Sequence, residues 1–146
     1  MTEYLRPDDV DMLVESEGWH WKDRGLALSA LAAPLPVFGE EVHPGLHRKA
    51  AVLLRAINRD HPLLDGNKRL SWYLVRAFYA LNGYDLYATA GEGDRYIRLV
   101  AGEISPSLDD IELWLDNHAL PLADNDQPVD TPARPKCTGG SATDGG

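Results

Sequence analysis

The chain has a single cysteine, no excess of positive charge and no long apolar run, and each of these absences excludes a class of protein. One cysteine, Cys137, among 146 residues excludes a disulfide framework and indicates a reducing compartment. The start, MTEYLRPDDV, is polar and acidic where a signal peptide has a basic and then an apolar stretch. No apolar run approaches the length of a membrane span. We therefore expect a cytoplasmic protein that does not associate with membranes.

The charge balance argues against nucleic acid as a direct partner. Lysine and arginine number 14 against 23 aspartates and glutamates, which gives a net charge of −9. A protein that holds a phosphate backbone along a broad surface needs a basic face, and here the cations are scattered singly among carboxylates. A small anion held in one local positive pocket is the kind of anionic ligand that this composition still allows.

The length and the composition along the chain predict one domain and a tail. A chain of 146 residues can bury a core without support from metals or disulfides. Residues 122–146 contain three prolines, four glycines and few apolar residues, so they cannot bury enough surface to offset ordering. We expect residues 1–121 to fold and residues 122–146 to form a disordered C-terminal tail.

Apolar periodicity and helix boundary residues predict a mostly α fold with about six helices. The predicted helices span residues 6–18, 23–34, 44–60, 66–83, 93–103 and 107–118. The apolar stripes of the two central helices are Leu46, Ala50, Leu53, Leu54 and Ile57, then Leu70, Leu74, Ala77, Phe78 and Leu81. Proline and glycine in residues 34–45 predict an irregular loop or short hairpin, and residues 84–89 are a candidate short extended piece.

The stretch DHPLLDGNKRLSW, residues 60–72, concentrates polar chemistry between the two central helices. Pro62 biases the residue before it away from helical geometry, so the first helix should end by about Asp60. The second helix should start near Gly66, and a helix start carries unpaired N–H groups that bind anions. Lys68 and Arg69 fall in that first turn, where cations destabilise a helix by up to about 1 kcal/mol. A bound anion would make the same cations favourable. Their presence therefore indicates a binding function at the expense of helix stability.

The residue types in this stretch match the needs of transfer from a nucleoside triphosphate. A neutral imidazole at His61 can accept a proton from an incoming hydroxyl. A carboxylate at Asp65, beside a phosphate site, suits Mg²⁺. A base, a metal-binding carboxylate and an anion hole together are the parts that phosphoryl transfer uses. The alternative is structural, because Asp-Gly-Asn is often a turn or a helix cap and short motifs match by chance. The residue types alone favour the two interpretations about equally.

The residues of this stretch resemble the motif of a known family. HPLLDGNKR is similar to the signature motif of the Fic/Doc family, and RGLALSALAAP, NGYDL and AGEIS are similar to segments of its death-on-curing (Doc) branch. The resemblance covers about residues 4–118. It implies a Fic/Doc-like helical bundle with a short flap loop or hairpin, and it makes residues 1–121 the catalytic domain.

The resemblance also implies roles for individual residues. It makes His61 the general base and Asp65 the Mg²⁺ ligand, with ATP as the nucleotide. The implied anion hole and phosphate contacts are Gly66, Asn67, Lys68 and Arg69, of which Lys68 also counts as catalytic. The implied flap is residues 35–43, in which Val37, Phe38 and Gly39 dock the protein target.

Lys68 decides which group the resemblance predicts to be transferred. Family members with glycine at this position typically transfer AMP, whereas the Doc branch has lysine and resembles a protein kinase. The implied function is a toxin of a toxin–antitoxin pair that moves the γ-phosphate of ATP to a Ser or Thr hydroxyl and blocks translation. Elongation factor Tu is a known target in the branch, and a cognate antitoxin is the implied partner.

Two alternatives stay open beside this prediction. One is AMP transfer on the same scaffold. The other is a catalytically weak homologue that only binds an antitoxin, because Leu63 stands where the signature usually has phenylalanine.

Residues outside the motif give weaker signals. His43 and His47 have a spacing that suits metal ligands on a helix, but no Glu or Cys accompanies them at ligand spacing. Lys49 and Arg76 are predicted to be solvated charges on helix faces. Buried packing is the expected role of Trp19 and Trp21.

Overall fold

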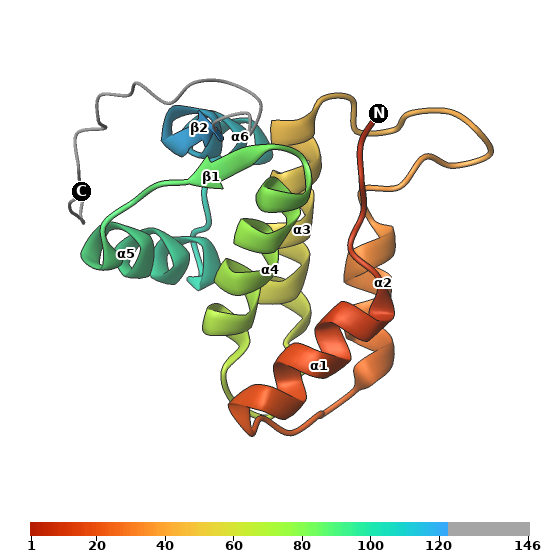
Figure 1. The fold of residues 1–146 in the computed structure, drawn as a ribbon. Helices are drawn as coiled ribbons and strands as arrows, with labels where there is room; N and C mark the ends of the chain where they lie inside the picture. Colours follow the sequence, from red (N-terminus) through yellow and green to blue (C-terminus); the bar gives the residue numbers. More distant parts are fainter. Residues whose placement is uncertain (123–146) are drawn as a thin grey trace.

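The structure, a computed structural model, describes residues 1–122. Within these residues six helices surround one core, and two short strands pair beside them (Figure 1). The elements are α1 (Pro7–Glu17), α2 (Arg24–Ala32), α3 (Leu46–Asp60), α4 (Asn67–Leu81), β1 (Tyr84–Leu86), α5 (Ala90–Ala101), α6 (Leu108–His118) and β2 (Ala119–Pro121). The prediction of a mostly α fold with about six helices is confirmed. Of the predicted tail, residues 122–146, all but Leu122 lie outside the described residues, and so does Cys137.

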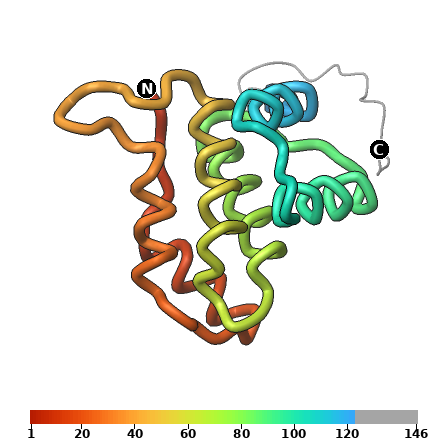
Figure 2. The backbone as a smooth tube through the Cα atoms, turned by 180° about the vertical axis from the view of Figure 1, so that it is seen from behind, coloured from red at the N-terminus to blue at the C-terminus, as the bar shows by residue number. Residues whose placement is uncertain are grey.

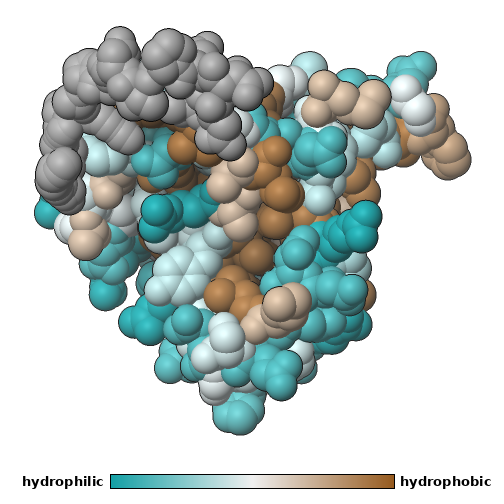
Figure 3. All heavy atoms as spheres, viewed as in Figure 1, coloured by the Kyte–Doolittle hydropathy of each residue, from teal (hydrophilic) through white to brown (hydrophobic). Residues whose placement is uncertain are grey.

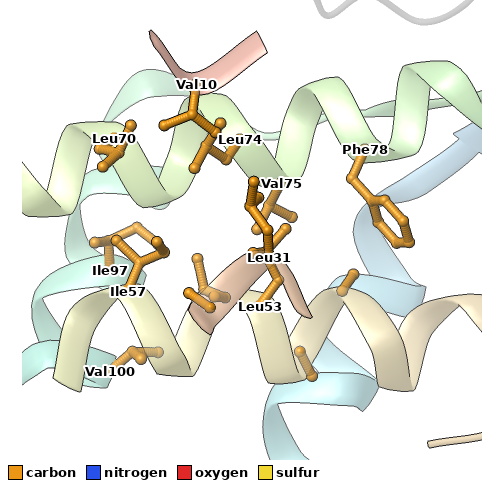
Figure 4. Close-up of a cluster of buried hydrophobic side chains, with 14 of the residues drawn as sticks. Val10, Leu31, Leu53, Ile57, Leu70, Leu74, Val75, Phe78, Ile97 and Val100 are labelled. Carbon is orange, nitrogen blue, oxygen red and sulfur yellow. The ribbon is translucent and has the colours of Figure 1, made fainter. Parts of the chain in front are cut away.

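Helices α3 and α4 form the centre of the molecule. Figures 1 and 2 show α1 and α2 on one side of this pair and α5 and α6 on the other. Leu53 and Ile57 of α3 face Leu70 and Leu74 of α4, and all four are nearly inaccessible to solvent (Figure 4). The neighbouring helices add Val10, Leu31, Ile97 and Val100 to the same cluster. This burial is the main source of stability, at about 25 cal/mol per Å² of apolar surface.

The predicted apolar stripe is confirmed for α3 and partly wrong for α4. Ala77 is exposed and Leu81 keeps 47% of its surface accessible, whereas Val75 and Tyr79 are buried in their place. Helix α4 packs against α3, α5 and β1 together, so its buried face is wider and turned relative to the predicted stripe.

Helix α5 begins three residues earlier than predicted. Thr89 caps it: the Thr89 hydroxyl accepts the N–H of Glu92 at 3.0 Å, and the Glu92 carboxylate accepts the N–H of Thr89 at 2.9 Å. This reciprocal pair satisfies two backbone donors at the helix start, which allows glycines in the first turn.

Only the first of the two short strands was predicted. Residues 84–86, the first half of the predicted extended piece 84–89, form β1, whereas β2 follows α6 without a sequence signal. The two pair antiparallel, with Tyr84 opposite Pro121 and Leu86 opposite Ala119. The pairing returns the chain to the end of α4.

The loop between α2 and α3 projects from the helical body (Figures 1 and 2). Its tip is a tight turn in which Val37 and Glu40 exchange two backbone hydrogen bonds of 2.9 Å each. Phe38 at the tip is fully exposed, with a left-handed φ of 51°. The prediction of an irregular loop or short hairpin is confirmed.

The prediction that Lys49 is solvated is wrong. Lys49 is 2% exposed, and its ammonium contacts the Glu41 carboxylate and donates to the carbonyl of His43 at 2.7 Å. A buried lysine needs such partners because the unpaired charge would be costly to desolvate.

The surface in Figure 3 is mostly hydrophilic, with a strip of apolar side chains running between α4 and the N-terminal segment. None of the helices within residues 1–122 combines the length and the apolar character that crossing a membrane requires.

Candidate active site

A five-residue loop after His61 joins α3 to α4 and carries the polar motif. Helix α3 ends at Asp60, as predicted, and the N–H of His61 still donates to the carbonyl of Ile57 at 3.1 Å. His61 takes a left-handed conformation, with φ 52° and ψ 66°. The proline that follows disfavours continuation of the helix, and the left-handed turn directs the chain away from the α3 axis. The imidazole is therefore exposed at the helix end.

The loop is fixed from outside by the segment that joins α1 to α2. The carbonyl of Pro62 accepts the N–H groups of Lys22 at 2.8 Å and Asp23 at 2.9 Å, and Trp21 and Leu63 form a single antiparallel bridge. Leu63 is only 1% exposed and belongs to the core. Leucine thus anchors the loop where the signature usually has phenylalanine.

The side-chain amide of Asn67 holds the loop from inside. Its oxygen accepts the N–H of Leu63 at 2.8 Å and its nitrogen donates to the carbonyl of the same residue at 3.0 Å. Asp65 accepts the N–H of Gly66 at 2.9 Å. Because the Asn67 amide is engaged at both ends, its backbone N–H is the group left to face a ligand.

Glycine is the one residue type that fits at position 66 without strain. Its φ is +98°, and a Cβ there would lie 2.8 Å from the indole nitrogen of Trp19. Trp19 stacks on Tyr73 of α4, with ring centroids 6.2 Å apart. The indole therefore lies directly over the start of α4, a contact that the sequence patterns did not predict.

The first turn of α4 presents free backbone donors. The first bond inside the helix runs from the N–H of Leu70 to the carbonyl of Gly66, at 2.8 Å. The N–H groups of Asn67, Lys68 and Arg69 precede it, and Gly66 supplies no capping side chain. Helix starts of this kind carry a partial positive charge and bind anions.

A cavity of about 650 Å³ opens over this turn, within the range of small-molecule sites. His61, Asp65, Gly66, Asn67, Lys68 and Arg69 all line it, so the structure brings the predicted motif residues together. Its other walls are Trp19, Leu64, three residues of α4 (Trp72, Tyr73 and Arg76), and Ala88, Thr89, Ala90, Gly93, Asp94, Ile97 and Arg98 at and before α5.

The cavity is positive although the chain is acidic. Four cationic side chains line it against two carboxylates, and one carboxylate, Asp94, pairs with Arg98 at 2.9 Å. Within residues 1–122, Lys68 and Arg69 have no ion-pair partner. The local field thus attracts an anion despite the net charge of −9.

Comparison with known proteins places the chain in a family. Residues 8–79 match the model of the Fic/DOC family. Over 92 residues the chain is 39% identical to "Toxin Doc" of Mycolicibacterium smegmatis, an alignment that covers 60% of this chain and 71% of that protein. The chain belongs to the Fic/DOC family. The predicted resemblance to its Doc branch is confirmed, and no solved structure gives a significant match.

The Fic/DOC motif accounts for one wall of the cavity, and α5 supplies the opposite wall. Gly93 lies against Trp72, since a Cβ on Gly93 would be 3.1 Å from the indole. Arg76, predicted to be a solvated charge, is half exposed but lines the cavity. The glycine at position 93 was the sequence signal that another group packs closely there. The sequence could not show that this group is the Trp72 indole.

The residues of this Fic/DOC site fit a metal that arrives with a nucleotide. No group of three or more potential ligands (His, Cys, Asp or Glu) within residues 1–122 is placed to hold a metal ion by itself. Asp65 is exposed in the cavity, and one of its oxygens is occupied by the N–H of Gly66. The other oxygen can take one position on Mg²⁺, which prefers a carboxylate or two plus phosphate oxygens.

His47, one of the two histidines whose spacing suits metal ligands, contacts a tyrosine and an aspartate. The Nδ1 atom of His47 lies 2.8 Å from the hydroxyl of Tyr79, and its Nε2 atom lies 3.3 Å from the carboxylate of Asp116. His47 thereby links α3 to α4 and α6. Burial raises the pKa of the Tyr79 hydroxyl far above its ordinary range, so Tyr79 stays neutral in this contact.

Proposed function

We propose that this chain is a Doc-type toxin that transfers the γ-phosphate of ATP to a Ser or Thr hydroxyl of a target protein. One observation carries the proposal: His61, Asp65 and the open, cation-flanked start of α4 line a single cavity large enough for a nucleotide. A relative that is 39% identical bears the name "Toxin Doc", which supports the toxin part.

In the proposed mechanism the start of α4 binds the phosphates. Residues 67–69 form the uncapped first turn of α4 and line the cavity, and Lys68 and Arg69 add two positive charges there. Backbone donors held by a helix need no reorganisation during the reaction, so they stabilise developing charge efficiently. The Asn67 side chain contributes indirectly, by holding the loop through Leu63. Lys68 adds a point charge for a terminal phosphate, which favours γ-phosphate transfer over AMP transfer.

His61 is the proposed general base. The target hydroxyl oxygen forms a bond to the γ-phosphorus while the bond from phosphorus to the β–γ bridging oxygen breaks, and ADP leaves. The hydroxyl proton passes to the imidazole of His61, which lies exposed at the cavity edge. Mg²⁺ held by Asp65 and phosphate oxygens would offset the negative charge of the bound nucleotide.

The protein target would dock on the projecting loop. Val37, Phe38 and Gly39 form its tip, and the exposed backbone edge of such a turn can pair with an extended segment. Elongation factor Tu is the proposed candidate target, so the activity would block translation in the cytoplasm. A cognate antitoxin is the proposed partner that restrains it.

Labelled ATP tests the proposal directly. The protein is incubated with purified elongation factor Tu, and separately with bacterial lysate, using ATP labelled on the α- or the γ-phosphate. We expect label on protein only from the γ-position, and Asp65→Asn should abolish it. Label retained from the α-position would instead establish AMP transfer.

The general base needs a variant that respects the backbone. Asparagine tolerates the left-handed conformation of residue 61 and lacks a base, so His61→Asn removes the chemistry with little strain. We expect His61→Asn to abolish both transfer and growth inhibition in bacteria. Its free energy of unfolding should equal that of the parent. If the parent and His61→Asn are equally harmless and neither labels a target, the weak homologue that only binds an antitoxin becomes the better description.

A further inference from the structure

Lys49 is a buried cation that the proposed chemistry does not use. It lies near the start of α3, on the opposite end of that helix from His61, and it does not line the cavity. Its ammonium contacts the carboxylate of Glu41 and donates to the carbonyl of His43 at 2.7 Å. Both partners belong to the returning limb of the loop between α2 and α3, so this cation joins the loop to the central helix.

The loop has little else to fix it. Residues 35–42 are all exposed, and the tip is closed only on itself by the two hydrogen bonds between Val37 and Glu40. The outgoing limb continues from the end of α2, where the N–H of Leu35 donates to the carbonyl of Ala32 at 3.0 Å. No side chain of residues 35–42 belongs to the apolar core or packs against it, so the polar contacts of Lys49 tie the returning limb to α3.

We propose that Lys49 is a positioning residue for the protein target: it anchors the loop of residues 35–43 so that the tip is held ready to dock. A buried ion pair is often no more stabilising than apolar side chains of the same volume, so stability alone does not explain this lysine. Anchoring does, because a loop fixed before binding has less conformational entropy to lose when the target docks. The kinetic part rests on the proposed transfer to a protein target.

Lys49→Met tests the anchor with little change in side-chain volume. Hydrogen exchange of the backbone amides of Val37 and Glu40 should become faster, since a loop that is free to move opens the two bonds of its tip more often. The KM for the protein target should rise about tenfold, the factor that ordering one or two loop side chains on binding corresponds to. The KM for ATP should not change, because Lys49 lies away from the cavity.

Two further variants make the result specific. Glu41→Gln removes the negative charge but keeps a side-chain oxygen that can accept from the Lys49 ammonium, so it weakens the anchor without leaving the buried cation unpartnered. It should shift exchange and target KM in the same direction. Arg48→Met is the matched control, because the ion pairs of this neighbouring cation within residues 1–122 are with Asp109 and Glu112 of α6 and none is with the loop. It should leave exchange in the loop and the target KM unchanged.

The outcomes separate this inference from the proposed function. Unchanged loop exchange in Lys49→Met and Glu41→Gln, or an equal rise in KM for ATP and for the target, overturns the anchor. If the parent chain transfers phosphate to no protein, the proposed function fails, and the exchange measurement still decides whether Lys49 anchors the loop.

Discussion

Replacing Gly66 with alanine should destabilise the protein by about 2–5 kcal/mol, through two separable effects. The first is backbone strain, because an L-residue at the φ of +98° found here is disfavoured by about 1–2 kcal/mol. The second is a clash, because the new Cβ would lie 2.8 Å from the indole nitrogen of Trp19 and 2.9 Å from the adjacent ring carbon. Ordinary van der Waals contacts begin at about 3.5 Å, so the indole must move, and overpacking of this kind costs about 1–3 kcal/mol.

Gly83 offers a matched control within the same chain. Its φ is +86°, but nothing lies within 4 Å of the Cβ that alanine would add. Gly83→Ala should therefore show only the backbone effect, about 1–2 kcal/mol. The difference between the two variants measures the contact with Trp19.

Urea unfolding followed by tryptophan fluorescence and circular dichroism gives the free energies of unfolding. In a Trp19→Ala background, the additional effect of Gly66→Ala should fall to that of Gly83→Ala, because the clashing ring is gone. If Gly66→Ala and Gly83→Ala destabilise equally, or if removing the Trp19 ring changes nothing, the indole does not restrict the start of α4 and this account of the site is wrong.

Three other substitutions have defined outcomes. Asn67→Ala removes both hydrogen bonds to the backbone of Leu63 and should lower the free energy of unfolding by about 1–3 kcal/mol in urea titrations, together with transfer activity. Lys68→Gly should reduce γ-phosphate transfer about 10- to 100-fold in the labelling assay, the loss of one charged contact, without a comparable loss of stability. The N–H of Thr89 holds the pKa of Glu92 below its ordinary value of 4.5. The folded chain therefore binds this proton less tightly than the unfolded chain, and the stabilisation is complete above pH 4.5 and lost as the pH falls through the lowered pKa. Glu92→Gln should therefore reduce the difference between the urea midpoints measured at neutral and at acidic pH.

Local features of the fold were predictable from the sequence. The end of α3 follows from a proline two residues beyond it, and the open start of α4 follows from a glycine followed by polar residues. The order of residues in the motif placed His61, Asp65 and Lys68 near one another because only one short loop separates them.

Features that depend on distant parts of the chain were not predictable in the same way. Trp19 reaches Gly66 from the segment after α1, and the α5 wall comes from a helix beyond β1, so neither contact has a fixed spacing in the sequence. The burial of Lys49 depends on where the loop returns, and the buried face of α4 depends on three neighbours at once. Periodicity identifies a helix, but its packing partners select the face.

The left-handed backbone of His61 determines which substitutions the folded chain tolerates at this position. Glycine would adopt the φ of 52° without a penalty of about 1–2 kcal/mol, so His61→Gly should yield a harmless protein that is no less stable than its parent. A mutation of His61 to glycine thus removes the imidazole without a cost in stability. Under the proposed function, a lineage that no longer needs the toxin can therefore lose the general base and keep the fold.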